Sequence, residues 1–223
     1  MVSMKQVFPG VFEHGSKLFT KNLVPGTKVY GERLVEEKGI GFRQWDFFRS
    51  KLGAAIKNGL RALPIKPGST VLYLGAAEGT TVSHVSDIVG EKGAVFGVDV
   101  SERVMRKFIS LAEQRKNIFP VVEDANKPWK YKGLLAERKI DVLFQDVSQK
   151  NQAQIFLKNA EYFSQKGSAG MLVVKAKSIS QRMDVSDVFG KEVGRLEEAF
   201  KVEQIVNLKP FEKDHVLANC IKQ

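Results

Sequence analysis

The sequence predicts an α/β fold in which a seven-stranded, mainly parallel sheet ends in an antiparallel hairpin, after a small N-terminal antiparallel β region. From Thr70 onward, strand-like apolar runs alternate with helix-like runs, as in the βα units that build parallel sheets. The last two strand-like runs are joined by only "KPFEKD", which is too short for a parallel crossover and therefore predicts a hairpin. Residues 1–45 differ, because Pro-Gly and Gly turns break their short β-type runs.

Two segments precede the alternating pattern. The first contains "VFPGVF", "KLFTKNLVPGTKVYGERLV" and "GIGF", whose short β-type runs predict the antiparallel region. The second, residues 49–63, has apolar side chains at helical spacing, with Ser50 as its N-cap and "PIKPGS" at its end. We therefore expect a small β domain at residues 1–48 and a larger domain at residues 49–223.

The larger domain follows a regular order. Apolar runs predict its strands at 70–75, 93–100, 117–124, 140–147, 170–177, 201–208 and 215–221. Amphipathic runs predict its helices at 81–90, 101–115, 151–164 and 186–200, of which the first ends at Gly90 and the second begins at Ser101. A parallel sheet that ends in an antiparallel hairpin is the outline of Rossmann-like class I methyltransferases rather than of dinucleotide dehydrogenases.

Length and composition limit the class of protein. The 223 residues are 43% apolar, which is enough to fill a sizeable core. No run approaches the roughly 20 apolar residues of a membrane span, and the first residues lack a secretory-signal pattern. Cys220 is the only cysteine and the three histidines lie far apart, so we expect no disulfide and no structural zinc site. These features predict a cytoplasmic protein without membrane contact.

The charge balance favours an anionic partner. Lysine and arginine number 35 and aspartate and glutamate 25, which gives a net charge of +10. Nucleic acid is the first candidate for such a basic chain, although charge alone does not identify it.

The stretch "VLYLGAAEGTTVSH" contains a glycine turn directly after the first strand of the larger domain. In open α/β sheets, ligands bind beyond the carboxyl ends of the strands, where glycine allows a sharp turn and a close ligand approach. Gly75 and Gly79 bracket this end, and Thr80 and Thr81 begin a helix whose free N–H groups favour polar ligand atoms. The G-x-x-x-G spacing differs from the dinucleotide G-x-G-x-x-G, because Ala76 occupies the middle of the turn.

Two acidic residues follow the next strands. Asp99 ends the second strand, where a carboxylate can accept hydrogen bonds from a ribose diol. Asp124 follows the third strand and could meet an adenine amino group. Together with a turn poorly shaped for a diphosphate, these acids predict a nucleoside ligand without phosphates, and S-adenosylmethionine is the expected cofactor. The alternative is a tight glycine turn with acids that merely end strands.

Several stretches resemble fibrillarin, the family of 2′-O-methyltransferases of box C/D ribonucleoprotein particles, in its short archaeal form. They run in family order over nearly the whole chain: "TKNLVPGTKVYGERL", "FRQWDFFRSKLGAAI", "VLYLGAAEGTTVSHVSDIVG", "KNIFPVVEDANKP", "QDVSQ", "VVKAKSI" and "PFEKDHVLA". No glycine/arginine-rich tail of the nucleolar type is present, which suggests an archaeal, cytoplasmic protein.

The resemblance implies particular site residues. The family's catalytic Lys–Asp–Lys–His set falls on Lys51, Asp146, Lys175 and His215. The expected cofactor-binding residues are Gly75, Ala76, Gly79, Thr80, Thr81, Asp99, Val100, Asp124, Ala125, Asp146, Val147, Ser148 and Gln149. Three positions depart from the family pattern, since Glu78 replaces an expected serine, Asp99 a usual glutamate and Ser148 a common alanine.

The expected chemistry needs removal of a proton from a ribose hydroxyl, together with stabilisation of the developing alkoxide. A positioned carboxylate, amine or imidazole can remove the proton, and a lysine cluster can stabilise the alkoxide. The sequence leaves open which of these groups is the base. Asp146 and Lys175 both lie at predicted strand ends, so they are expected at one edge of the sheet.

The resemblance also implies partners. Fibrillarins assemble with a Nop-domain scaffold protein, a kink-turn-binding ribosomal-type protein and a box C/D guide RNA, which selects the target rRNA or tRNA by base pairing. The N-terminal β region could dock on such partners, or it could simply pack on the larger domain. The alternatives to a guide-dependent RNA 2′-O-methyltransferase are a methyltransferase of another acceptor, such as a protein side chain, and a non-catalytic RNA-binding subunit.

Overall fold

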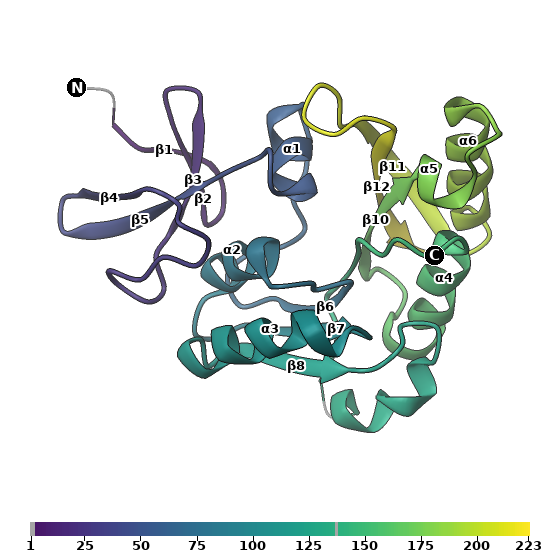
Figure 1. Ribbon diagram of the computed structural model, residues 1–223, viewed down its shortest axis with the longest axis horizontal. Coiled ribbons are helices and arrows are strands. Elements are labelled where there is room, and N and C mark those ends of the chain that lie inside the picture. The colour runs from purple at the N-terminus through teal and green to yellow at the C-terminus, as the bar shows by residue number, and fades with distance from the viewer. Residues whose placement is uncertain (1–2, 137) are drawn as a thin grey trace.

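A computed structural model describes residues 3–136 and 138–223 and contains two sheets (Figure 1). The N-terminal sheet is antiparallel and has the order β1-β2-β3-β5-β4. Its strands are β1 (Lys5–Phe8), β2 (Val11–His14), β3 (Lys17–Lys21), β4 (Leu34–Glu37) and β5 (Ile40–Trp45). The predicted antiparallel β region is thus confirmed, whereas the domain boundary at residue 48 stays a prediction.

The second sheet has seven strands in the order β11-β12-β10-β9-β6-β7-β8. They are β6 (Thr70–Leu74), β7 (Ala94–Asp99), β8 (Ile118–Val122), β9 (Val142–Gln145), β10 (Ala169–Lys175), β11 (Phe200–Asn207) and β12 (His215–Lys222). β12 pairs antiparallel with both β10 and β11, whereas β10, β9, β6, β7 and β8 pair in parallel. The predicted mainly parallel sheet with a C-terminal antiparallel hairpin is therefore confirmed.

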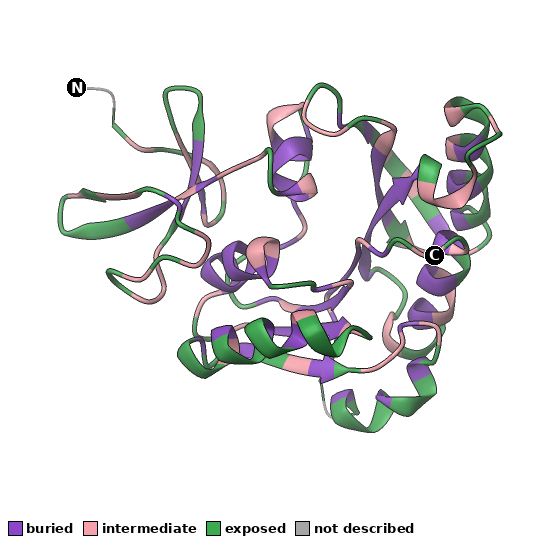
Figure 2. Cartoon of the chain, viewed as in Figure 1, coloured by how far each residue is buried: buried purple, intermediate pink, exposed green. Residues whose placement is uncertain are grey.

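Helices cover both faces of this sheet. They are α1 (Lys51–Lys57), α2 (Thr80–Val89), α3 (Glu102–Gln114), α4 (Gln152–Phe163), α5 (Ala176–Ile179) and α6 (Val185–Leu196), with 3₁₀ turns η1 (Pro128–Lys130) and η2 (Lys132–Leu135). Alternate side chains of β6 face opposite layers, because strand side chains have a period of two. Val71 and Tyr73 join the core beneath α1, α2 and α3, whereas Leu72 and Leu74 join the core beneath α4 and α6. The central strands of the sheet are buried, whereas the helices have both buried and exposed residues (Figure 2). Within the described residues, no helix is both long and apolar enough to cross a bilayer.

The two serines expected as helix N-caps differ in whether their side chains make a capping hydrogen bond. The Ser50 side chain accepts a hydrogen bond from the Gly53 amide, so the predicted cap of α1 is confirmed. Ser101 occupies the N-cap of α3 without a side-chain hydrogen bond. The helix predicted at 49–63 is too long, because α1 ends at Lys57 and a left-handed Gly59 follows. Leu60 and Leu63 still reach the core from the loop, which explains the misleading helical spacing.

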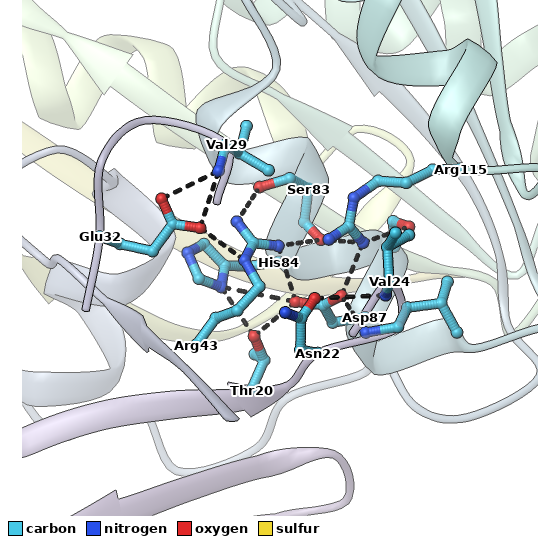
Figure 3. Close-up of polar contacts among 12 residues, drawn as sticks. Thr20, Asn22, Val24, Val29, Glu32, Arg43, Ser83, His84, Asp87 and Arg115 are labelled. Carbon is cyan, nitrogen blue, oxygen red and sulfur yellow. Dashed lines mark hydrogen bonds and ion pairs between the residues drawn. The ribbon is translucent and has the colours of Figure 1, made fainter. Parts of the chain in front are cut away.

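A buried polar network ties the N-terminal sheet to the second sheet's helices (Figure 3). Arg43 of β5 is fully buried and donates to Glu32 at 2.6 Å and to Asp87 of α2 at 2.8 Å. Arg115, at the C-terminal end of α3, donates to the other oxygen of Asp87 at 2.6 Å. Buried charges are costly unless paired, so these partners hold the two units in one arrangement.

His84 of α2 lies at the centre of this network. Its Nδ1 is 2.8 Å from Thr20 Oγ1, which donates its own proton to Asp87 Oδ2 at 2.7 Å, so Nδ1 carries the hydrogen. Nε2 lies 2.7 Å from the Tyr30 hydroxyl, which also donates to the Gln44 carbonyl at 3.0 Å, and burial raises the pKa of Tyr30 to about 12. The ring stacks on Trp45 with a centroid distance of 4.9 Å. Burial, with the nearby guanidinium groups, lowers the pKa of His84 well below its ordinary value.

Mild acid should therefore destabilise the protein. The unfolded chain binds a proton at His84 below about pH 6.5, whereas the folded chain does not, so stability falls as the pH drops through this range. We expect the free energy of unfolding to decline by up to about 1.4 kcal/mol per pH unit between pH 6.5 and 5. Denaturant titrations of the wild type and His84→Gln at several pH values test this prediction. If the free energy of unfolding of the variant declined with falling pH as steeply as that of the wild type, His84 would not be the cause.

Candidate functional site

The glycine turn after β6 brings two strand ends together. Gly75 has a φ of +85°, and the amides of Gly75 and Ala76 bond the carbonyl of Val98, at distances of 2.8 and 3.2 Å. A Cβ on Gly75 would lie only 2.8 Å from the carbonyl oxygen of Asp146. Gly75 therefore allows the segment that follows β9 to approach the turn, in a backbone conformation that favours glycine.

Gly79 also has a packing role. Its φ is +91°, and a Cβ there would lie 2.5 Å from Leu111 and 2.7 Å from Phe108, both on α3. The space left by its missing side chain is thus filled by the protein itself, so Gly79 serves helix packing. The first two residues of α2, Thr80 and Thr81, follow it, and Thr81 Oγ1 donates to Ser50 Oγ at 3.0 Å.

A cavity of about 470 Å³ lies at the carboxyl ends of the parallel strands. Its wall contains many of the residues singled out from the sequence. They are Lys51, Gly75, Asp99, Val100, Ala125, Asp146, Val147, Ser148, Gln149 and Lys175. Ala77 and Val98 also line it and were not expected, because backbone turns and strand ends carry no side-chain signal for a ligand. Five expected cofactor residues lie outside this lining, namely Ala76, Gly79, Thr80, Thr81 and Asp124.

The acids at the two strand ends differ in their surroundings. Asp99 Oδ2 accepts the Ala77 amide at 3.0 Å and Oδ1 accepts the Ser101 amide at 2.9 Å, so the carboxylate is fixed at the cavity wall. Asp124 accepts hydrogen bonds from Asn126 and, at 3.5 Å, from Gln149. Burial alone would raise the pKa of Asp124, but these hydrogen bonds outweigh it and lower the pKa from its ordinary value. Asp124 thus stays ionised and orders the loop that carries Gln149.

Asp146 lies between two lysines. Its Oδ2 is 3.2 Å from Lys51 Nζ, and its Oδ1 is 2.8 Å from Lys175 Nζ. Lys175 Nζ also donates to the Asp146 carbonyl at 2.8 Å and to Ser148 Oγ at 3.0 Å, which holds the ammonium in place. Strands β9 and β10 are parallel neighbours, as the sequence predicted. Asp146 follows β9 and Lys175 ends β10, so the pair meets at one sheet edge.

One oxygen of the Asp146 carboxylate has unused hydrogen-bonding capacity. Asp146 Oδ1 is buried and, among the described residues, has no hydrogen bond of good geometry despite its proximity to Lys175 Nζ. An acceptor with unused lone pairs beside a fixed cation can bind a hydroxyl and receive its proton. Asp146 could alternatively have capped the next helix, but Asn151 occupies the N-cap of α4.

His215 joins this cluster indirectly. It begins β12 and pairs in register with Lys175, and its Nδ1 contacts the carbonyl of Lys213. Glu212 Oε2 is 3.9 Å from His215 Nδ1, and Glu212 Oε1 is 3.8 Å from Lys51 Nζ. Glu212 therefore links the histidine to the lysine, a role that the sequence did not reveal because it depends on how the loop after β11 folds back.

Tyr73 is a second residue that the sequence did not indicate. It is buried in β6 and stacks on Phe144 of β9, with ring centroids 4.5 Å apart. Burial and the nearby Asp146 carboxylate raise its pKa well above the ordinary value, so its hydroxyl remains protonated beneath the cluster. The sequence alone would assign an aromatic residue of a buried strand to the hydrophobic core. The proximity of Tyr73 to Asp146 becomes clear only from the fold.

Known proteins match this chain over nearly its whole length. The family model described as Fibrillarin matches residues 2–223. A fibrillarin-like rRNA/tRNA 2′-O-methyltransferase of Pyrococcus abyssi is 50% identical over 218 residues, covering 96% of this chain and 95% of the relative.

Two solved structures are also similar. A crystal structure of Aeropyrum pernix fibrillarin with natively bound S-adenosyl-L-methionine has a TM-score of 0.87 and 39% identity, covering 99% of this chain and 100% of that one. A crystal structure of a fibrillarin/Nop5p complex has a TM-score of 0.89 and 36% identity, covering 98% of this chain and 100% of that one. With the family model matching residues 2–223, these likenesses show that the chain belongs to the fibrillarin family.

Proposed function

We propose that this protein catalyses guide-RNA-directed transfer of a methyl group from S-adenosylmethionine to a ribose 2′-hydroxyl of rRNA or tRNA, within a box C/D ribonucleoprotein. The observation that carries the proposal is the Asp146 carboxylate held between Lys51 and Lys175 at the wall of a cavity. The activity named for the Pyrococcus abyssi relative supports the RNA substrate.

The cavity fits the proposed cofactor. Asp99 presents a fixed carboxylate suited to a ribose diol, and Val100, whose side chain is largely exposed, offers an apolar surface to an adenine ring. Gly75 and Ala77 supply backbone to the same lining, where the Ala77 amide bonds Asp99 Oδ2 at 3.0 Å. S-adenosylmethionine supplies an electrophilic methyl group when it is bound. The bound cofactor in the Aeropyrum pernix relative supports the same assignment.

Asp99→Ala should weaken cofactor binding. Hydrogen bonds to a charged group contribute about 1.5–3 kcal/mol, so the dissociation constant should rise roughly 10- to 150-fold. Calorimetric titration with S-adenosylmethionine measures this. Asp99→Glu is the matched control, because it keeps the carboxylate and should largely retain binding. An unchanged affinity in the alanine variant would remove the ribose assignment.

Residues of the protein have separate roles at the acceptor 2′-hydroxyl. The Asp146 carboxylate, which lines the cavity, accepts the hydrogen bond of the ribose hydroxyl and receives its proton. The ammonium of Lys175, held by the Asp146 carbonyl and Ser148, stabilises negative charge that develops on the hydroxyl oxygen. Lys51 neutralises the other carboxylate oxygen and fixes the orientation of Asp146. Glu212 contacts Lys51 at 3.8 Å, and His215 lies beside the other oxygen of Glu212 at 3.9 Å.

The protein acts in this proposal as one subunit of an assembly in the cytoplasm of an archaeal cell. The complex of a related fibrillarin with Nop5p supports a Nop-domain scaffold as one partner. The others are a kink-turn-binding protein, a guide RNA and the target RNA. The net charge of +10 supports direct contact with RNA backbone.

Radiolabelled methyl transfer tests the function directly. The protein is mixed with S-adenosylmethionine and target RNA, with the scaffold, the kink-turn protein and the guide present together or omitted one at a time. We expect transfer to the target only with the complete set. Labelling of a protein component instead would favour the alternative acceptor, and binding without any transfer would favour a non-catalytic RNA-binding subunit.

A further inference from the structure

An aromatic cluster lies beside the catalytic residues and takes no part in the roles described above. Phe48 is three residues before Lys51, and its side chain is 63% exposed. Its ring centroid is 5.2 Å from that of Phe47 and 5.2 Å from that of Phe211, which precedes Glu212. Phe47 and Phe211 are 4.7 Å apart and pack on the core, so they support Phe48 from below.

The position of Phe48 is fixed from both ends. The Phe48 amide donates to Asp46 Oδ1 at 2.9 Å in a local turn, and Ser50 caps α1 immediately afterwards. The Lys51–Glu212 contact of 3.8 Å joins α1 to the loop between β11 and β12, which lie close together in Figure 1. A large apolar ring is thus held open to solvent at the rim of the catalytic cluster.

The surroundings of the ring are basic. Arg49 follows Phe48 directly, and the loop that carries Phe211 also carries the exposed Lys209 and Lys213. The nearby acid Glu212 is already engaged by Lys51. Arg49 stacks on Tyr30 at 5.0 Å and donates to its carbonyl at 3.4 Å, whereas the two lysines are exposed. An aromatic ring near such cations is complementary to a nucleic acid, whose sugars offer apolar contact and whose phosphates pair with the cations.

From this geometry we infer that Phe48 packs against the sugars of the target strand next to the acceptor nucleotide, in the minor groove of the target–guide duplex. A-form RNA displays its 2′-hydroxyls in a wide, shallow minor groove. A protein that presents Asp146 to one of these hydroxyls must therefore face that groove, and Phe48, in the turn just before α1, lies beside the Lys51–Glu212 contact at the same end of the molecule. Apolar side chains such as Phe are established minor-groove wedges in DNA. The inference rests on the proposed function.

Photo-crosslinking gives the direct test. The full ribonucleoprotein is assembled with p-benzoylphenylalanine in place of Phe48, and in a control in place of Tyr162. Tyr162 is 44% exposed near the end of α4, toward the opposite edge of the sheet. We expect position 48 to crosslink to the target strand within a few nucleotides of the methylated one, and position 162 to give no such crosslink. Crosslinking only to the scaffold protein, or none to RNA, would overturn the inference.

Kinetics give the second readout. Phe48→Ala should lower kcat/KM for the target RNA about 10-fold, which corresponds to about 1.4 kcal/mol of lost contact, whereas Phe48→Tyr should retain most of it. Cofactor affinity and scaffold binding should stay at wild-type values. An alanine variant with wild-type kcat/KM would contradict the inference even if a crosslink formed. Failure of the wild type to methylate would instead count against the proposed function, while the crosslink would still decide whether position 48 meets RNA.

Discussion

Replacing Lys175 with alanine should lower the single-turnover rate of methylation by about 10²–10³, the loss expected for one preorganised donor to a developing oxyanion. The Lys175 ammonium is held by the Asp146 carbonyl at 2.8 Å and by Ser148 at 3.0 Å, so its charge is in place before the reaction begins. Its contribution is made chiefly in the transition state, and cofactor affinity and assembly should therefore remain nearly unchanged.

The same experiment tests whether Lys175 acts as a unit with Asp146. In the double variant Lys175→Ala with Asp146→Ala, the methylation rate should fall by much less than the product of the two single reductions. Either change alone already removes the 2.8 Å contact between Lys175 Nζ and Asp146 Oδ1. Lys177→Ala is the matched control, since this exposed lysine of α5 lies only two residues away. A near-normal rate for Lys175→Ala, or full additivity with Asp146→Ala, would show that the coupled mechanism is wrong.

Asp87→Ala should destabilise the protein by about 3–5 kcal/mol, because it leaves Arg115 without its carboxylate and Arg43 with only Glu32. Breaking a buried ion pair exposes the remaining charge to an apolar interior without compensation. Asp87 also accepts the Leu23 amide at 3.0 Å, so the link to the N-terminal segment is lost with it. Denaturant unfolding followed by circular dichroism measures the change.

An exposed pair provides the control for this prediction. Lys107 Nζ lies 2.7 Å from Glu78 Oε1, and half or more of each side chain is exposed. Such pairs contribute about 0–1 kcal/mol, so Glu78→Ala should leave the unfolding midpoint almost unchanged. If Asp87→Ala were as mild as Glu78→Ala, the buried network would not be what holds the N-terminal sheet in place.

The sequence predicted the succession of strands and helices along the larger domain well, because each βα unit carries its own pattern. Strand ends could be located, and parallel neighbours place those ends at one edge, so the meeting of Asp146 and Lys175 followed from the fold class. Lys51 came from the family resemblance, since nothing in the local pattern of α1 indicates that its first residue contacts Asp146.

Other features depend on tertiary contacts that no local pattern encodes. Gly79 was expected to make room for a ligand, yet its missing side chain is filled by Phe108 and Leu111 from α3. The local sequence gives no sign that Arg43 is buried, because an arginine in a strand is usually solvated. Its burial depends on the ion pair with Asp87, which belongs to α2. Glu212 depends in the same way on how its loop folds back to Lys51.

One measurement tests the central claim most directly, which is that the Asp146 cluster acts on the 2′-hydroxyl of the nucleotide selected by the guide. Two target RNAs are compared in the assembled complex, identical except for a 2′-deoxy substitution at that nucleotide. We predict that the labelled methyl group is found on this ribose in the unmodified RNA and that labelling falls to background in the deoxy RNA. Equal labelling of both RNAs, or label at a base or on a protein, would contradict the account.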